Sequence, residues 1–443
     1  MGMDQVGVAQ KGGQTRRHRM CRVPPEEGER PQRVDVQAAW LAASGGVAAE
    51  GEQRTVDFPG QRTRQFVRVP LTPTEQAAGA KRRWSDMNHT HLALALLTLG
   101  DPGRLTGGYL YHRRLAELAP QSRARIEFVS FPDRPFPWAA LDAPLVLRRA
   151  CRLGAHVIVL DSIAAAFLGP WLAFRPPPLP LIGMLHQPPG GIDHGPVRTA
   201  LQARLDRLAY RRACRLLVAS ESLLEQLGAS VPRHVMCVVP PGRDVAKASG
   251  RAPGDLRQGR RAALLCVGNW VERKGIHSLL EAFARLPQET AALHLVGDDR
   301  ADPRYAARVR ARLRQPDLAG RVVVHGPLPV EEVAALYQAA DAFVLPSVKE
   351  PYGTVYGEAM AFGLPVVGWR AGNLPYLADD GREGLLLAPG DLGGLAKALA
   401  RLADDEAFRR QLGEAARRRA LSRPTWEETA ALFFTAIREA LNA

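Results

Sequence analysis

Residues 350–368 decide how this chain is expected to fold: Glu350-Pro-Tyr-Gly-Thr-Val-Tyr-Gly-Glu358-Ala-Met-Ala-Phe-Gly-Leu-Pro-Val-Val-Gly368. Two carboxylates stand eight residues apart, across a loop and the start of a short helix, and an apolar strand follows. Gly353 permits a tight turn where the helix begins. The order of loop, helix and buried strand is the repeating unit of a parallel α/β sheet. The stretch therefore predicts one βαβ segment of such a sheet.

A second stretch lies upstream and predicts the first strand of the same sheet. Residues 264–276 read Leu-Leu-Cys-Val-Gly-Asn-Trp-Val-Glu-Arg-Lys-Gly-Ile, an apolar run followed by a loop that contains Arg273 and Lys274. Such a strand-to-helix transition directs unpaired backbone N–H groups at an anion. The cationic side chains add to this field, because arginine and lysine both pair with phosphate oxygens. A solvated surface turn is the alternative for this loop taken alone.

The alternation of strands and helices extends in both directions from these stretches. The pattern starts near Met87, and it restarts after a segment rich in Arg, Gly, Ala and Pro at 243–261. We therefore predict two doubly wound Rossmann-like domains that face each other across a cleft, at residues 87–242 and 262–424, joined by a linker at 243–261. Strands are expected at 92–99, 156–160, 181–185 and 216–219, then at 262–267, 292–296, 322–325, 342–345 and 364–368.

The two ends of the chain have different patterns. Residues 1–86 show no sustained apolar periodicity and are interpreted as a disordered N-terminal extension. Residues 425–443 have apolar positions at helical spacing, which predicts a C-terminal helix that packs back toward the N-terminal domain.

Composition sets limits on the class of protein. The net charge is +14, yet there is no compact basic run, and aromatic residues are only 6% of the chain, so a nucleic-acid partner is not expected. The five cysteines are scattered without CxxC spacing, which predicts neither disulfides nor a zinc site and favours a cytoplasmic protein. Basic charge and the apolar segment 167–185 permit peripheral contact with the inner face of a membrane.

The acid loop and the basic loop together predict a site for a nucleotide diphosphate that carries a sugar. Glu358, one turn inside its helix, can accept two hydroxyl donors, which suits a ribose. Glu350 precedes the turn and is placed to meet the sugar. The N-terminus of the helix that begins near Val355 offers its positive end to the diphosphate. An exposed or capping glutamate is the alternative for each carboxylate taken singly.

These residues resemble the GT-B family of retaining nucleotide-sugar glycosyltransferases, specifically the group 1 or family 4 type with its E-x7-E motif. Glu350 and Glu358 match that motif, and the resemblance continues through Ala340–Ser347, Leu295–Asp298 and Gly384-Leu385. It is strong over residues 262–390, weaker over 87–242, and absent from the first 86 residues. One departure is Asn269, which stands where the family usually has arginine; we interpret Arg273 as the compensating cation.

The resemblance implies a role for each matching residue. Lys274 would bind the donor diphosphate, Glu350 the transferred sugar and Glu358 the ribose. His186, after an expected strand, would lie near the transferred sugar, so Glu350 and His186 are the candidate catalytic residues. The remaining candidate donor-binding residues are Gly107, Gly108, Arg273, Tyr352, Gly353, Thr354 and Val355.

The expected activity is that of a hexosyltransferase that moves a sugar from a UDP or GDP donor to a hydroxyl acceptor with retention. Neither a metal ion nor another cofactor is expected, because no acidic cluster shows metal spacing. The acceptor is left open among saccharides, lipids and small metabolites. Two alternatives remain, a non-catalytic nucleotide-sugar-binding relative and a glycoside hydrolase or phosphorylase.

Overall fold

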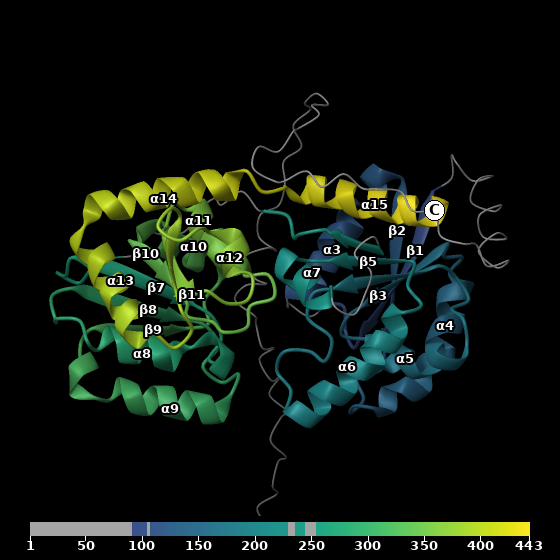
Figure 1. Cartoon of the computed structure of the whole chain (residues 1–443), viewed down its shortest axis with the longest axis horizontal. Helices are drawn as coiled ribbons and strands as arrows, with labels where there is room; N and C mark the ends of the chain where they lie inside the picture. The colour runs from purple at the N-terminus through teal and green to yellow at the C-terminus, as the bar shows by residue number, and fades with distance from the viewer. Residues whose placement is uncertain (1–90, 104–106, 229–234, 244–253) are drawn as a thin grey trace, which may run out of the picture. The chain divides into compact units, whose positions relative to one another are not determined.

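The computed structural model describes residues 91–103, 107–228, 235–243 and 254–443. The predicted extension at residues 1–86 lies outside the described residues, as does most of the predicted linker. Within the described ranges the chain forms two six-stranded sheets in which every neighbouring pair of strands is parallel. The prediction of two doubly wound α/β domains is therefore confirmed, and Figure 1 labels their elements.

The first sheet has the strand order β2-β1-β3-β4-β5-β6. Its strands are β1 (Leu92–Leu99), β2 (Ala124–Phe131), β3 (Val157–Asp161), β4 (Leu181–Leu185), β5 (Arg215–Val218) and β6 (Met236–Val238), and its helices are α3 (Gly107–Leu118), α4 (Ala143–Arg152), α5 (Ala165–Phe174), α6 (Pro196–Tyr210) and α7 (Glu221–Leu227). The strands β1, β3 and β4 are continuous apolar runs that are buried on both faces, as parallel strands covered by helices must be.

The second sheet has the order β12-β11-β10-β7-β8-β9, in which the first strand along the chain, β7, lies at the centre. This is the strand order of dinucleotide-binding Rossmann folds. Its strands are β7 (Ala262–Val267), β8 (Ala291–Val296), β9 (Val322–Gly326), β10 (Ala342–Val344), β11 (Val366–Trp369) and β12 (Gly384–Leu387), and its helices are α8 (Ile276–Phe283), α9 (Pro303–Leu313), α10 (Val330–Ala339), α11 (Thr354–Ala361), α12 (Leu374–Leu377), α13 (Leu392–Asp404) and α14 (Glu406–Leu421).

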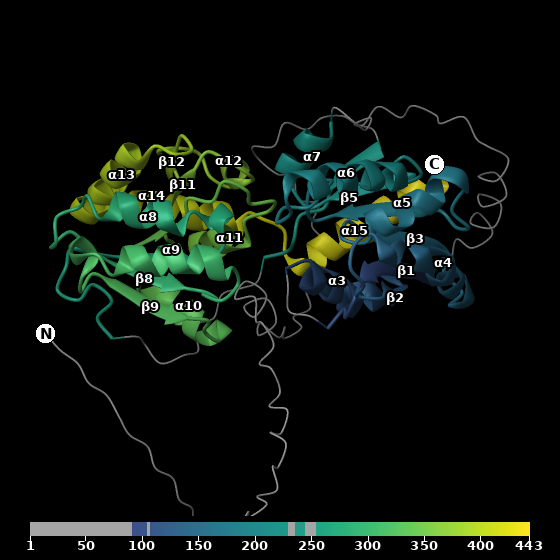
Figure 2. The ribbon, with the colours of Figure 1, turned by 90° about the horizontal axis from the view of Figure 1, so that it is seen from below.

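The last helix, α15 (Trp426–Asn442), packs on the first sheet rather than on the second. It begins at a capping box, in which the Thr425 side chain accepts from the backbone N–H of Glu428 and the Glu428 carboxylate accepts from the backbone N–H of Thr425. Its buried residues Phe433 and Phe434 share a core with β1 and α3. Figures 1 and 2 both show α15 along the same side of that sheet as α3.

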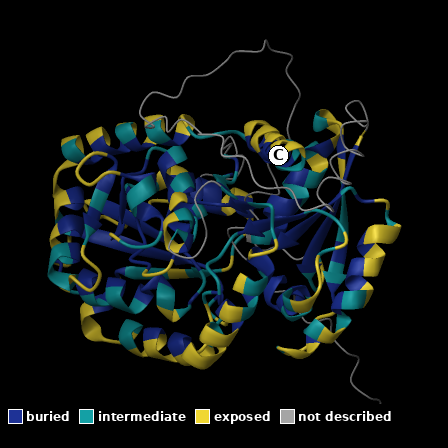
Figure 3. Cartoon of the chain, turned by 45° about the vertical axis from the view of Figure 1, so that its right-hand side comes forward, coloured by how far each residue is buried: buried dark blue, intermediate teal, exposed yellow. Residues whose placement is uncertain are grey.

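Burial follows the two sheets. Figure 3 shows most of the strands in the buried colour and the outward faces of the covering helices as exposed, whereas the edge strands β2 and β9 are largely half-buried. In the first domain, alternate residues of each strand point to opposite cores: Ala95 and Leu97 pack toward α4 and α5, whereas Leu94 and Leu96 pack toward α3 and α15. The end of the predicted linker joins the second core, where Leu256 is buried. No helix within the described ranges is long and apolar enough to cross a bilayer.

Candidate functional site

The topology of the second sheet brings the two charged loops together. β7 and β10 are neighbours, and their carboxyl ends lie at the same edge of the sheet. The loop after β7 contains a single turn of 3-10 helix, η4 (Glu272–Lys274), and the loop after β10 contains Glu350. Residues that are 76 positions apart in sequence are thereby placed in direct contact.

Lys274 and Glu350 form a buried ion pair at this edge. The Lys274 Nζ donates to Glu350 Oε2 at 2.6 Å, and the two residues are only 3% and 6% exposed. The Arg273 guanidinium lies 3.7 Å from the same carboxylate oxygen and also donates to the carbonyl of Lys349. Two cations therefore meet the Glu350 carboxylate, and Arg273 also donates to Asp193 Oδ1 at 2.9 Å, so two carboxylates match the two cations.

The backbone of both loops fixes this cluster. The carbonyl of Arg273 accepts from the N–H of Val348 at 2.9 Å and from the Ser347 hydroxyl at 3.0 Å. Gly275 has φ +70°, and a Cβ on it would stand 2.1 Å from the carbonyl oxygen of Pro346. Only glycine permits this close approach of the two loops, which explains why Gly275 directly follows η4.

Helix α11 begins directly after the acid loop. Its N-cap is Gly353, which has φ +85° and would meet side chains of Tyr356 and Leu377 if it carried a Cβ. Thr354 and Val355 form the first turn, where backbone N–H groups have no acceptor within their own helix. The backbone carbonyl of Tyr352 accepts from the side chain of Asn373 at 2.7 Å, which holds the residue before the turn.

Glu358 lies on the buried side of α11. The Tyr337 hydroxyl of α10 donates to Glu358 Oε2 at 3.1 Å, and both residues are buried. Burial, and then the charge of Glu358, raise the pKa of Tyr337 well above its ordinary value, so this hydroxyl remains a donor. Glu358 is thus a positioned acceptor rather than an exposed helix residue.

Asn269 has a structural contact in this arrangement. Its Oδ1 accepts from the backbone N–H of Asp298, which joins the loop after β7 to the loop after β8. The cation nearest to Glu350 besides Lys274 is Arg273. The interpretation that Arg273 compensates for Asn269 is thus compatible with the geometry and stays a prediction.

The predicted residues of the first domain lie at the carboxyl edge of the first sheet. Gly107 and Gly108 begin α3, and a Cβ on Gly108 would contact the His186 ring at 3.7 Å. His186 follows β4, and its backbone N–H donates to the Ser162 hydroxyl at 3.2 Å. The structure therefore divides the predicted residues into two groups, one at the edge of each sheet.

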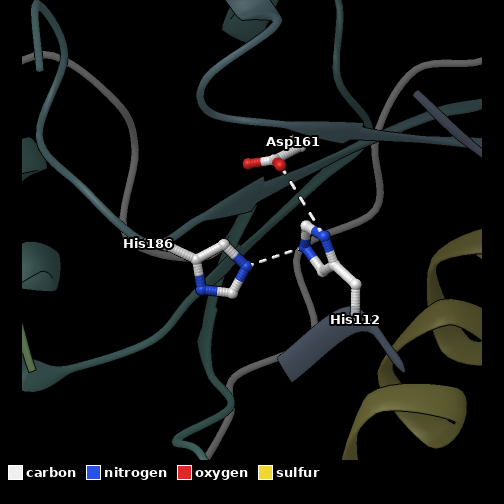
Figure 4. Close-up of side chains that lie close together, drawn as sticks. All are labelled: His112, Asp161 and His186. Carbon is white, nitrogen blue, oxygen red and sulfur yellow. Dashed lines mark hydrogen bonds and ion pairs between the residues drawn. The ribbon is translucent and has the colours of Figure 1, made fainter. Parts of the chain in front are cut away.

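Two residues that the sequence did not single out lie beside His186. His112 of α3 places its Nε2 2.8 Å from the Nε2 of His186, and its Nδ1 is 3.6 Å from an oxygen of Asp161 at the end of β3. Figure 4 shows the three side chains in a row. Burial lowers the pKa of His112 to about 3; burial and then the charge of His112 lower the pKa of His186 to about 3, against an opposing effect of Asp161.

His112, Asp161 and His186 are also the one group of histidine, cysteine or acidic residues in the described ranges with ligand atoms close enough for a metal ion. Two nitrogens on one tetrahedral zinc ion, at the usual bond length, lie about 3.3 Å apart. The 2.8 Å between the two Nε2 atoms is instead the length of a hydrogen bond. The arrangement therefore fits a hydrogen-bonded chain, and a metal-free site stays a prediction.

Comparison with known proteins finds similarity that is strongest in the second domain. Residues 261–405 match the family model described as Glycosyl transferases group 1. A D-inositol 3-phosphate glycosyltransferase of Corynebacterium jeikeium is 35% identical over 190 residues, which are 40% of this chain and 45% of that protein. The chain spans about half the length of the four similar Corynebacterium enzymes.

Solved structures share the fold of the whole described part. Sucrose-phosphate synthase from Thermosynechococcus elongatus has a TM-score of 0.66 and 23% identity, over 79% of this chain and 98% of that chain. Anabaena HepE in complex with UDP-glucose has a TM-score of 0.63 and 20% identity, and the match covers 79% of this chain and 99% of that chain. The predicted GT-B type of fold, with two Rossmann-like domains, is confirmed by these likenesses.

Proposed function

We propose that this protein is a hexosyltransferase that moves a sugar from a nucleotide-diphosphate donor to a hydroxyl acceptor. The observation that carries the proposal is the buried Lys274–Glu350 ion pair, with the half-buried Arg273 against it, beside the N-terminus of α11. The cluster lies at the carboxyl edge of a Rossmann sheet, where such folds bind nucleotides. The names of the related glycosyltransferases support the same assignment.

In this proposal the donor diphosphate is bound by fixed positive groups. Lys274 has three N–H donors, of which one is directed at Glu350, and the first-turn N–H groups of α11 offer two more. Arg273 can contact phosphate oxygens with two parallel bonds. As the sugar leaves, negative charge develops on the diphosphate, and preorganised donors of this kind stabilise it without reorganisation.

The two glutamates would hold the two ends of the donor. Glu358, fixed by Tyr337, would accept the hydroxyl groups of the ribose. Glu350 would accept hydroxyl groups of the transferred sugar while it keeps Lys274 in place. His186 and the backbone at Gly108 would contribute from the first domain, if domain closure brings them over the donor. UDP is the donor nucleotide to test first, since HepE, which shares this fold, has been solved with UDP-glucose.

The proposed reaction proceeds with retention and without a metal ion. Glycosyl transfer passes through an oxocarbenium-like transition state, and the cations with the end of α11 would take the place that a magnesium ion has in other nucleotide sites. The departing phosphate would receive the proton of the acceptor hydroxyl on the same face of the sugar. The acceptor, a saccharide, a lipid or a small metabolite, is not specified by these contacts.

The proposal is tested by incubating the protein with a panel of UDP and GDP sugars and candidate acceptors, with and without EDTA. We expect release of the nucleoside diphosphate together with a glycoside whose anomeric configuration, read by NMR, equals that of the donor. Hydrolysis of simple glycosides without nucleotide would favour a glycosidase, and cleavage that depends on phosphate would favour a phosphorylase. Binding of the donor without turnover would favour a non-catalytic relative. Loss of turnover in EDTA would contradict the metal-free mechanism.

A further inference from the structure

The row Asp161–His112–His186 lies at a particular point of the first sheet. In the order β2-β1-β3, the strand order reverses between β1 and β3, and ligands of open α/β sheets bind beyond the carboxyl ends at such a point. Asp161 ends β3, Thr98 is near the end of β1, and His186 follows β4. Three neighbouring strands therefore contribute to one polar cluster where a substrate would lie.

Asp161 has the hydrogen bonding of an ionised carboxylate. Its Oδ2 accepts from the Thr98 hydroxyl at 2.9 Å, and its Oδ1 accepts from the Ser162 hydroxyl and from the backbone N–H of Ile163, each at 3.3 Å. A protonated carboxyl would have to use one of these positions as a donor. Burial raises the pKa of Asp161, but these hydrogen bonds oppose that effect.

The carboxylate determines where His112 carries its proton. His112 Nδ1 is buried and has no hydrogen-bond partner within the described ranges, and Asp161 Oδ2, at 3.6 Å, is the charged atom that faces it. A bare Nδ1 would direct its lone pair at a negative oxygen, whereas an N–H there is attracted to it. The pKa of about 3 keeps the ring neutral, so Nδ1 carries its only proton and Nε2 is an acceptor.

The tautomer of His112 in turn determines that of His186. The contact of 2.8 Å between the two Nε2 atoms holds one proton, and His112 does not supply it, so His186 Nε2 is the donor. His186 is also neutral, which leaves its Nδ1 without a proton. No hydrogen bond within the described ranges uses that Nδ1. The ring of His186 also packs edge-on against Tyr111, with ring centroids 4.8 Å apart, which limits its rotation.

We propose that Asp161, acting through His112, fixes His186 in the tautomer with its proton on Nε2, so that the bare Nδ1 accepts a hydrogen bond from a hydroxyl of the transferred sugar. Asp161 and His112 are then positioning residues. The inference rests on the proposed function, because the hydroxyl belongs to the donor sugar, but the tautomer itself is a property of the protein alone.

Asp161→Asn is the decisive variant. The backbone N–H of Ile163 is a fixed donor, so it requires the oxygen of the asparagine at the Oδ1 position and places the amide NH2 toward His112. That NH2 donates to His112 Nδ1, which moves the proton of His112 to Nε2 and the proton of His186 to Nδ1. The side chain keeps its shape, so the fold is expected to persist. Asp161→Asn/His112→Gln is the rescue, since the glutamine oxygen can again accept from His186 Nε2.

The readout is the NMR spectrum of protein with 15N-labelled histidine, in which one-bond and long-range couplings distinguish a protonated from a bare ring nitrogen. A His186→Gln spectrum assigns the signals of His186. We expect Nε2–H in the natural protein, Nδ1–H in Asp161→Asn, and Nε2–H again in the double variant. An Nδ1–H tautomer in the natural protein, or no change in Asp161→Asn, would overturn the inference, as would stoichiometric zinc binding that His112→Gln abolishes.

Kinetics test whether the tautomer matters for sugar transfer. With UDP-glucose or the sugar donor that the panel identifies, we expect Asp161→Asn to lower kcat by roughly 10–100-fold, as loss of such supporting contacts does elsewhere. Binding of UDP alone, which lacks the sugar, should be unchanged, and the double variant should recover most of kcat. If the tautomer reverses while kcat is unchanged, the proposal that His186 Nδ1 accepts a hydrogen bond from the sugar is wrong. If the natural protein transfers no sugar, the proposed function fails while the tautomer result stands.

Discussion

At the residue scale, the site depends on how a few cations are distributed around one carboxylate. Lys274 and Arg273 share Glu350, whereas Asn269, where arginine is usual in the family that the sequence resembles, is committed to the backbone of Asp298. An arginine at 269 would lose that contact. In the proposed donor site, Arg273 is therefore the second cation available to the diphosphate.

Arg273→Ala is expected to weaken binding of UDP by roughly 10- to 150-fold, because one charge-assisted hydrogen bond to phosphate contributes roughly 1.5–3 kcal/mol. Isothermal titration with UDP measures this, with Arg273→Lys as the matched control that keeps the charge and loses only the forked geometry. Asn269→Arg in the Arg273→Ala background should not restore binding fully, since it removes the contact with Asp298. Unaltered affinity in Arg273→Ala would refute the compensation.

At the element scale, a pair of stacked histidines joins β8 to β9. His294 Nε2 donates to the carbonyl of Leu256 at 2.8 Å, so its Nδ1 accepts from His325 Nε2 at 2.9 Å. Burial lowers the pKa of both rings, and the charge of His294 lowers that of His325 further. This contact requires His294 to be neutral, because a protonated His294 has no lone pair on Nδ1 to accept the hydrogen bond.

Acid should therefore weaken this domain. Below the ordinary histidine pKa of about 6.5 the unfolded chain takes up protons that the folded chain does not, so the free energy of unfolding falls, by at most about 1.4 kcal/mol per pH unit for each ring. Asp206 of the first domain acts in the opposite direction. Burial raises its pKa to about 7, so the folded chain takes up its proton before the unfolded chain does, and the free energy of unfolding rises as pH falls from 7 toward 4. Urea unfolding at pH 7.5 and 5.5 should show a smaller loss in His325→Gln than in the natural chain. Equal losses in both would contradict this account of β8 and β9.

The helix α15 provides a second prediction at this scale. Phe433 is fully buried against the first sheet, whereas its neighbour Leu432 is 46% exposed. Phe433→Ala should lower the free energy of unfolding by about 3–5 kcal/mol, and Leu432→Ala, the matched control, by no more than about 0.5 kcal/mol. Chemical denaturation measures both values. If the two variants lose the same stability, α15 does not pack as described.

Sequence patterns predicted the long buried elements and missed the marginal ones. Continuous apolar runs such as β1 and β7 are unambiguous, but β2 is an edge strand whose half-exposed residues Arg125 and Glu127 interrupt the pattern. β12 has only four residues. Helix α15 and its packing toward the N-terminal domain were both predicted, whereas the particular contacts that Phe433 and Phe434 share with β1 and α3 were not.

The candidate site was predictable where a motif carried it. Glu350 and Lys274 belong to recognisable loops, and strand adjacency then placed them in contact. His112 and Asp161 belong to no motif, and 49 residues separate them in the sequence. One signal was present: Asp161 ends an apolar strand whose carboxyl end lies at the ligand edge. Nothing in the sequence could show that a histidine of α3 reaches it.

At the scale of the whole molecule, apolar exposure is uneven. Of the ten exposed large hydrophobic residues in the described ranges, six lie between residues 138 and 201. Trp138 and Leu141 lie on the 3-10 helix η2 (Trp138–Asp142), and Leu145 follows one turn later on α4. With a net charge of +14, this surface is compatible with the predicted peripheral contact with a membrane.

We expect the protein to sediment with vesicles that contain anionic phosphatidylglycerol and not with neutral phosphatidylcholine vesicles. Binding should weaken as salt is raised, because the attraction is screened. Replacing Trp138, Leu141 and Leu145 together by serine should reduce binding, whereas the control Leu421→Ser/Leu432→Ser, on α14 and α15, should not. Equal binding by both variants would exclude this surface as the docking face.

The proposed donor site is tested most directly by UDP binding to two variants that differ in a single cation. Glu350→Gln retains Lys274, whereas Lys274→Met/Glu350→Gln removes both charges and leaves neither buried alone. UDP at about 100 times its Kd should stabilise the natural protein by about 2.7 kcal/mol. We predict a similar UDP-induced shift in Tm for Glu350→Gln and almost none for the double variant at the same UDP concentration. A full shift in the double variant would contradict a diphosphate site built on Lys274.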